Sequence, residues 1–172
     1  MSNLLIDQKT NLLVTAAVGA IVENNVETVF DFTVAEDVIT EFLKSEPEVT
    51  GYDILQGPWG QSGANRWVYF GDEKAKEQVN WIQRPYLFDY QLTDFTSDLK
   101  NMVDLAVAQF LFRPIGPRTE IKWYYNFRAR SEEVLPQLMD FVENVWVPWM
   151  NSYLDDTKKA LDYDVFYPNK ME

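Results

Sequence analysis

The spacing of apolar residues changes twice along this chain, and this change limits the fold more than any other feature. From Val49 to Arg130, apolar and polar residues alternate with a period of two, which is typical of half-buried strands. Before and after that segment the period lies near 3.6, as in amphipathic helices. The chain therefore predicts a long section of strands between two helical sections, which is an α+β architecture.

Short links divide the middle section into strands. We expect strands at 49–56, 65–70, 76–84, 86–94, 102–113 and 118–129, preceded by a first strand at 12–23. Glycine and proline occupy several links, and connections this short join antiparallel neighbours. The prediction is a curved, seven-stranded antiparallel sheet.

Helical spacing predicts two short helices after the first strand. Asn24 precedes Glu27 by three residues, which resembles the capping box at the start of a helix. A second apolar stripe from Val38 to Leu43 stops before Pro47. Both helices are expected to be short.

One long helix is predicted from about 132 to 163. Its apolar face is formed by Leu135, Leu138, Val142, Val145, Trp146, Trp149 and Tyr153. Pro148 is interior and predicts a kink. We expect a single domain over 1–172, with its core at 12–163 and an irregular tail at 164–172.

Turn lengths determine which side chains share a face of the sheet. Three assumed turns pair Phe70 with Lys76, Trp81 with Phe88, and Phe110 with Ile121. One face then carries nine large aromatic residues: Trp67, Tyr69, Trp81, Phe88, Tyr90, Phe110, Trp123, Tyr125 and Phe127. The other face is polar, contains Arg66 and Arg128, and suits solvent.

The long helix must cover this aromatic face, because no other expected element is long enough. Trp146, Trp149 and Tyr153 would then meet the sheet aromatics. Rings of this size either pack tightly or leave a cavity, and both outcomes stay open from the residues alone. We favour a cavity and predict that these three residues and the nine sheet aromatics bind a ligand.

Four short motifs accompany this order of elements. They are Val26-Glu27-Thr28-Val29-Phe30, Gly57-Pro58-Trp59-Gly60 followed by Gly63 and Arg66, Glu77-Gln78-Val79, and Gly116-Pro117-Arg118-Thr119 before Trp123. With them, residues 12–163 resemble the helix-grip fold of the START-like SRPBCC superfamily, particularly its polyketide cyclase/dehydrase-like branch. Pro117 departs from the Gly-Thr pattern of related chains. The resemblance implies a cavity for lipids, sterols or polyketides, and in some members an enzyme.

Histidine and cysteine are both absent, which excludes a thiolate nucleophile, a Ser-His-Asp triad and an ordinary zinc site. We expect no metal and no other cofactor. Glu77 falls on the aromatic face, where burial would raise the pKa of its carboxyl, although a solvated position near the strand start is favoured. The same two alternatives apply to Asp104, a carboxyl buried on the aromatic face or one exposed at a strand end, and the exposed position is favoured. In a cyclase-type reaction these carboxylates would move protons, and Tyr90, Tyr69 or Tyr125 would hold an oxyanion.

Two other features have structural interpretations. Gly57, Gly60 and Gly63 lack the Lys-Ser/Thr ending of a phosphate loop and lead into a strand, so a turn is favoured. Arg66, on the outer face in the assumed register, is expected to be solvated or ion-paired.

The charge of the chain limits its partners. With 15 basic and 27 acidic residues, the net charge is −12, which argues against nucleic acids and anionic membranes. The N-terminus lacks the pattern of a secretory signal, and the longest weakly polar run is too short to span a bilayer. We therefore expect a cytoplasmic protein without membrane insertion, and a homodimer is possible.

Three functions follow in order of preference. The first is binding of an apolar, aromatic, polyketide-like or lipid-like small molecule between the sheet and the last helix. The second is a polyketide cyclase or dehydratase that uses the same cavity. The third is a protein-interaction module whose core has collapsed, which should show an exposed apolar patch in place of a cavity.

Overall fold

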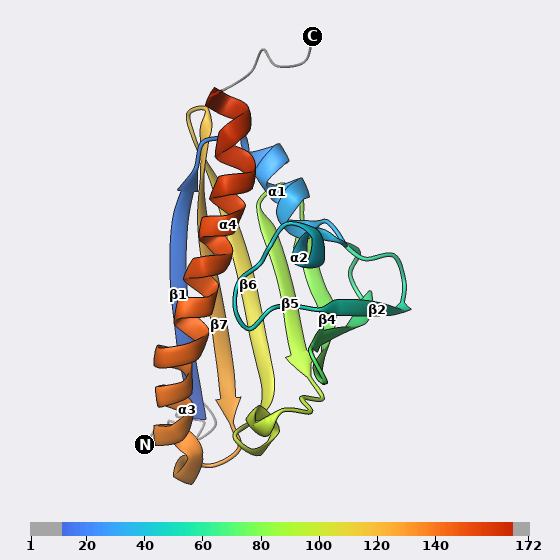
Figure 1. Cartoon of the computed structure of the whole chain (residues 1–172), viewed down its shortest axis with the longest axis vertical. Coiled ribbons are helices and arrows are strands. Elements are labelled where there is room, and N and C mark those ends of the chain that lie inside the picture. Colours follow the sequence, from blue (N-terminus) through green and yellow to red (C-terminus); the bar gives the residue numbers. More distant parts are fainter. Residues whose placement is uncertain (1–11, 167–172) are drawn as a thin grey trace, which may run out of the picture.

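A computed structural model describes residues 12–166, with side chains to residue 162. Its elements, in chain order, are β1 (Leu13–Val22), α1 (Val26–Val34), α2 (Val38–Glu41), β2 (Gly51–Gln56), β3 (Asn65–Phe70), β4 (Glu73–Gln83), β5 (Leu87–Thr93), η2 (Asp98–Asn101), β6 (Val103–Ile115), β7 (Arg118–Ala129), η3 (Glu132–Val134), α3 (Leu135–Phe141), η4 (Val142–Trp146) and α4 (Val147–Phe166) (Figure 1). The predicted order of strands and helices is confirmed. The helix extends past the predicted end at 163, and residues 167–172 of the predicted tail lie outside the described residues.

The strands form one antiparallel sheet in the order β1-β7-β6-β5-β4-β3-β2. Each strand from β2 to β6 pairs with the next strand in sequence, and β1 pairs with β7. Figure 1 shows the C-terminal helix running lengthwise across one face of this sheet, with α1 and α2 beside its upper part. This is the predicted helix-grip architecture.

The start of α1 differs from the prediction by one residue. The backbone N–H of Thr28 donates to Asn25 Oδ1 at 2.9 Å, so Asn25 is the capping residue. The predicted cap, Asn24, instead donates through its side-chain amide to the carbonyl of Leu161 at 3.3 Å. The turn after β1 is therefore tied to the C-terminal helix.

The C-terminal helix contains a wide turn immediately before its interior proline. Residues Val142 to Trp146 form a π-helical turn, and Pro148 follows in the first turn of α4. Proline has no backbone N–H to donate, and a π turn is a common way for a helix to absorb such an interruption. The wide turn carries Trp146 at its end.

The β3–β4 turn is tighter than predicted. Phe70 pairs with Glu73 instead of Lys76, across a two-residue turn that begins at Gly71 with φ of 64°. This change of register by three residues reverses the faces of β3, so Arg66 is buried and Trp67 and Tyr69 leave the inner face.

A second predicted pairing is wrong because β4 contains a β-bulge. Val79 pairs with Tyr90, which is the register that the assumed pairing of Trp81 with Phe88 requires. The register then shifts between Val79 and Trp81, so Trp81 pairs with Asp89 instead of Phe88. As a result, Trp81 is 60% exposed on the outer face.

The β6–β7 register differs from the prediction by two residues. Phe110 pairs with Trp123 instead of Ile121, because the turn at Gly116 and Pro117 has two residues instead of four. A shift of two preserves the side-chain alternation, so the predicted inward faces of β6 and β7 are correct.

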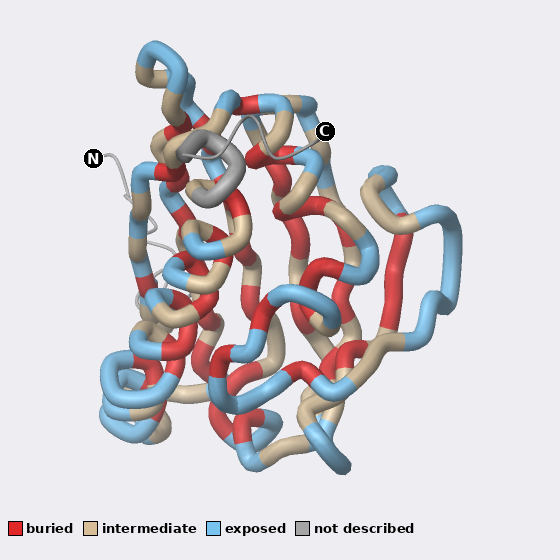
Figure 2. The backbone as a smooth tube through the Cα atoms, turned by 45° about the horizontal axis from the view of Figure 1, so that its top comes forward, coloured by how far each residue is buried: buried red, intermediate tan, exposed pale blue. Residues whose placement is uncertain are grey.

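The interior between sheet and helix is largely filled by aromatic rings. Trp123 is stacked on Phe110 with ring centroids 4.5 Å apart, and Tyr153 of α4 lies 4.8 Å from the same indole. Trp146 meets Tyr125 edge to face at 5.1 Å. Figure 2 shows buried positions along the strands and on the helix side that faces them.

The corrected registers can be tested with two tryptophans of the same sheet. We expect Trp123→Ala, which empties a fully packed position, to lower the free energy of unfolding by about 3–5 kcal/mol. Trp81→Ala should change it by less than about 0.5 kcal/mol, because that side chain is mostly in solvent. Urea unfolding of both variants is the measurement, and similar losses in the two would contradict the bulge.

Candidate functional site

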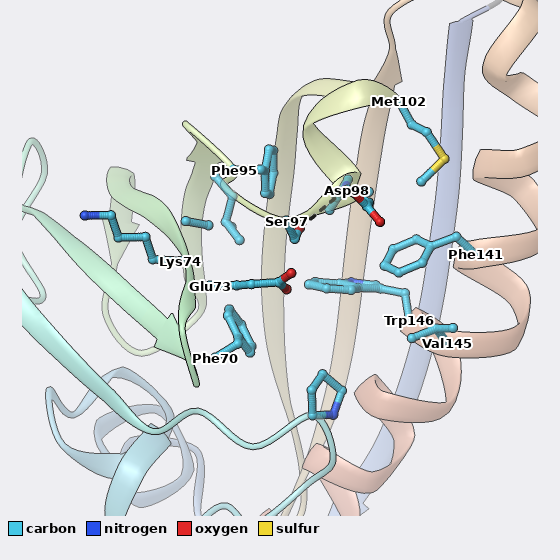
Figure 3. Close-up of a pocket in the computed structure, with 14 residues that line it drawn as sticks. Phe70, Glu73, Lys74, Phe95, Ser97, Asp98, Met102, Phe141, Val145 and Trp146 are labelled. Atoms are coloured by element: carbon cyan, nitrogen blue, oxygen red, sulfur yellow. Dashed lines mark hydrogen bonds between the residues drawn. The ribbon is translucent and has the colours of Figure 1, made fainter.

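An open pocket of about 350 Å³ lies between the sheet and the C-terminal helix, at the end of the sheet where β4 begins (Figure 3). Its walls come from the β3–β4 hairpin, the end of β5, the η2 segment, and the helix around its π turn. Most of the lining is apolar, and four aromatic residues contribute: Phe70, Phe95, Phe141 and Trp146. The pocket thus lies between the sheet and the C-terminal helix, and it is confined to one end of them.

Local structure explains how the pocket walls are held. The tight turn after Phe70 starts β4 at Glu73, from which Glu73 and Ala75 line the pocket. Ser97 caps η2, accepting a hydrogen bond from the backbone N–H of Leu99 at 3.3 Å. Opposite them, the π turn places Trp146 beside Phe141, with ring centroids 6.0 Å apart.

Carboxylates supply the ionised groups that face the pocket. Glu73 and Asp98 both line it, and neither forms an ion pair or a side-chain hydrogen bond with residues 12–162. Figure 3 shows the Glu73 side chain directed toward the Trp146 indole, whereas Lys74 extends away from the pocket. The Lys74 ammonium lies 4.2 Å from the ring centroid of Trp67.

Deeper in the protein lies a second void of about 20 Å³, and both residues of a buried ion pair line it. Arg66 Nε donates to Glu77 Oε2 at 2.8 Å, and Arg66 Nη1 donates to the carbonyl of Glu36 at 2.8 Å. The guanidinium carbon also lies 3.7 Å from the ring centroid of Trp59, a cation–π contact. This void has room for about one water molecule, not for a substrate.

The structure corrects the expected surroundings of this pair. Arg66 was expected on the outer face, solvated or ion-paired, and it is ion-paired but only 4% exposed. Glu77 is 6% exposed, whereas a solvated position near the strand start was favoured over burial on the aromatic face. The β3–β4 register is the reason, because it turns Arg66 inward and sets it directly opposite Glu77. Each charged side chain can be buried because the opposite charge of the other compensates for the loss of water.

Three tyrosines share this interior. The hydroxyls of Tyr90 and Tyr125 are 2.8 Å apart. Burial raises the pKa of Tyr90 and Tyr125 well above the usual value, and it raises the pKa of Tyr153 as well; the nearby Glu77 carboxylate adds to all three shifts. The three phenols therefore stay protonated at neutral pH.

The predicted ligand-binding residues divide into four groups. The open pocket is lined by one of them, Trp146. The inner void is lined by four: Phe88, Tyr90, Phe110 and Tyr153. The remaining inward residues, Trp123, Tyr125, Phe127 and Trp149, are packed in the core. Trp67, Tyr69 and Trp81 lie on the outer side, so the predicted inward placement of these three was wrong.

Asp104 does not face the aromatic interior. It lies in a β-bulge at the start of β6, and both of its carboxylate oxygens accept hydrogen bonds from Arg128, at 2.8 and 2.9 Å. The Arg128 guanidinium lowers the pKa of Asp104. Its side chain is 37% exposed, as the alternative of an exposed strand end predicted.

Apart from Trp146, sequence reasoning did not predict the residues that line the open pocket. Glu73 was assigned to a turn, and Phe95, Ser97 and Asp98 fall where one predicted strand ends and the next has not begun. Ser97 followed by Asp98 is a helix-start signal that would have located η2. Among the described residues, no group of three acidic side chains is placed to hold a metal, and no helix is long and apolar enough to cross a membrane.

Comparisons with known proteins support the fold. No protein-family model matches the chain, and no curated protein matches its sequence. Among solved structures, Ara h 8.0201 has a TM-score of 0.68 at 15% identity, covering 86% of this chain and 97% of its own. Major latex-like protein 151 from Panax ginseng has a TM-score of 0.68 at 13% identity, covering 87% of this chain and 98% of its own.

A third similar structure is an enzyme. Norcoclaurine synthase from Thalictrum flavum, in complex with dopamine and hydroxybenzaldehyde, has a TM-score of 0.62 at 12% identity, covering 96% of this chain and 94% of its own. Likeness at this level of identity establishes a shared fold and leaves activity open. The chain thus shares the helix-grip fold of these structures.

The buried ion pair gives a stability prediction. Glu77→Leu should lower the free energy of unfolding by about 3–5 kcal/mol, because it leaves the Arg66 charge buried without its partner. The double variant Arg66→Met/Glu77→Leu should recover part of that loss. Urea unfolding of the single and double variants forms the cycle, and strictly additive losses would contradict a direct interaction.

The buried tyrosines give a pH prediction. An unfolded chain loses phenol protons as the pH rises through about 10, whereas the folded protein retains those of Tyr90, Tyr125 and Tyr153. Because the folded pKa values are raised, the free energy of unfolding should be unaffected below that range and should fall above it. Phenolate absorbance in native and urea-unfolded protein checks this, and full ionisation without unfolding would refute it.

Proposed function

We propose that this helix-grip protein binds an apolar, ring-containing small molecule in the open pocket at the end of the sheet. The observation that carries the proposal is the pocket itself, about 350 Å³ in volume and lined mainly by aliphatic and aromatic side chains. Small-molecule sites commonly occupy about 300–1,000 Å³, so this pocket suits a compact ligand of one to three rings.

The fold neighbours support a ligand of this size. The norcoclaurine synthase structure holds dopamine and hydroxybenzaldehyde, which are both single-ring molecules. A pocket in this position is also reached from solvent without opening the aromatic core. Binding in the core itself would require Trp123 and its neighbours to separate, against the packing of their rings.

The catalytic alternative has less support. Glu77 is the most deeply buried of the proposed acid–base residues, and it lines a void with room for about one water molecule. Its carboxylate is already paired with Arg66. A cyclase that uses Glu77 and Tyr90 would have to enlarge that void around each substrate.

The interaction-module alternative is weakened by the pocket. That alternative required a collapsed interior and an exposed apolar patch, whereas an open apolar cavity is present. A cytoplasmic location and a homodimer stay predictions.

A neutral fluorescent probe tests the binding function. We expect N-phenyl-1-naphthylamine to bind with increased emission, and Ala75→Leu, which fills the pocket, to weaken binding by about tenfold or more. Trp81→Ala, on the outer face, is the control and should bind as the parent protein does.

Circular dichroism checks that the variants fold. Because Ala75 is 3% exposed, a second variant, Val145→Trp, obstructs the pocket from a helix position that is 42% exposed. Equal binding by the parent protein and both pocket variants would place the probe elsewhere and contradict the proposal.

A further inference from the structure

The charges around the open pocket are of one sign. Glu73 and Asp98 line it without a cationic partner among residues 12–162. The one basic residue of the lining, Lys74, holds its ammonium 4.2 Å from the ring centroid of Trp67, on the outer side of the hairpin. Figure 3 shows Lys74 extending away from the enclosed space and Glu73 extending into it. A ligand in this pocket therefore meets carboxylates and no positive side chain.

The aromatic lining favours the same ligand charge. The rings of Phe70, Phe95, Phe141 and Trp146 reach the pocket from four different segments: the end of β3, the link before η2, α3 and the π turn. Ring faces attract cations, and aromatic residues from several directions are how proteins hold ammonium groups. An aromatic wall with carboxylates at its edge suits a ligand that is both apolar and positively charged.

The pocket offers an anion very little. Ser97 supplies one neutral hydroxyl, whose oxygen accepts a hydrogen bond from the backbone N–H of Leu99 and whose O–H carries no charge to balance an anion. No arginine lines the pocket. A fatty acid or another apolar carboxylate would bring its charge beside the like charge of Glu73 without a cationic partner, and like charges repel.

The charge of the whole chain acts in the same direction. A net charge of −12 repels anionic ligands and raises the local concentration of cations, and clefts lined by one sign of charge concentrate this effect. The local and the overall charge are therefore both complementary to an organic cation.

We propose that the ligand of this pocket is an organic cation, a protonated amine or quaternary ammonium attached to an apolar ring system. This inference rests on the proposed binding function and specifies the chemical class of its ligand. Glu73 and Asp98 balance the positive charge, and the four aromatic rings contact the charged group and the apolar body.

Three ligands of nearly equal size separate charge from shape. They are 2-naphthylmethylammonium, 2-naphthylmethanol and 2-naphthoate, titrated into the full chain by isothermal titration calorimetry. We expect the ammonium compound to bind about tenfold more tightly than the alcohol, and the carboxylate to bind more weakly than the alcohol. The preference for the ammonium compound over the alcohol should decrease as salt is added, because salt screens the charges.

Variants identify the groups responsible. Glu73→Gln and Asp98→Asn should each weaken binding of the ammonium compound by about three- to tenfold and leave binding of the alcohol unchanged. Glu27→Gln removes the same charge from α1, outside the pocket, and should leave all three affinities unchanged. All three side chains are exposed, so the variants should fold.

The possible failures are distinct. Equal affinity for the ammonium compound and the alcohol, or no effect of Glu73→Gln and Asp98→Asn on ammonium binding, would overturn the charge inference and leave the binding function standing. Failure of all three ligands and of the neutral probe to bind would contradict the binding function, and the charge inference with it.

Discussion

Close stacking of aromatic rings around Trp123 determines where this protein has room for a ligand. Phe110 covers one side of the indole at 4.5 Å, Tyr153 of α4 lies at 4.8 Å, and Trp149 lies at 5.7 Å. Rings in contact at these distances exclude other molecules and join the sheet to the helix along its length. The remaining space is therefore at the end of the sheet, where the helix passes through its π turn and the strands give way to turns.

The Arg66–Glu77 pair is the polar counterpart of that core. It joins β3 to β4 directly, it reaches the carbonyl of Glu36, and it supports Trp59 of the glycine-rich loop. In the same interior, the hydroxyls of Tyr90 and Tyr125 form a hydrogen bond with each other. A buried ion pair adds little net stability over apolar residues of similar size, because both charges lose their water. We interpret the pair as a structural element that sets the register of β3, while the ionised groups able to meet a ligand lie in the open pocket.

Much of the fold could be predicted from the chain, and less of the site. The alternation of side chains placed β6 and β7 correctly, because an error of two residues in the turn at Gly116 does not change which face a side chain occupies. The register across the turn at Gly71 differs from the prediction by three residues, and an odd difference exchanges the two faces of a strand. The bulge before Trp81 leaves no sign in the alternation of apolar and polar residues. Those two local features alone moved Trp67, Tyr69 and Trp81 to the outer side and brought Arg66 inside.

The sequence by itself determined the order of elements, the antiparallel sheet, the aromatic interior and the acidic charge, because each follows from local periodicity or from composition. Tertiary structure decided whether the aromatic interior is hollow, since that depends on how Phe110, Trp123 and Tyr153 fit together across three elements. It also decided which carboxylates face the pocket. Glu73 and Asp98 are distant in sequence and come from a hairpin and a short 3₁₀ helix, and the chain brings them to one pocket only when the sheet closes on the C-terminal helix.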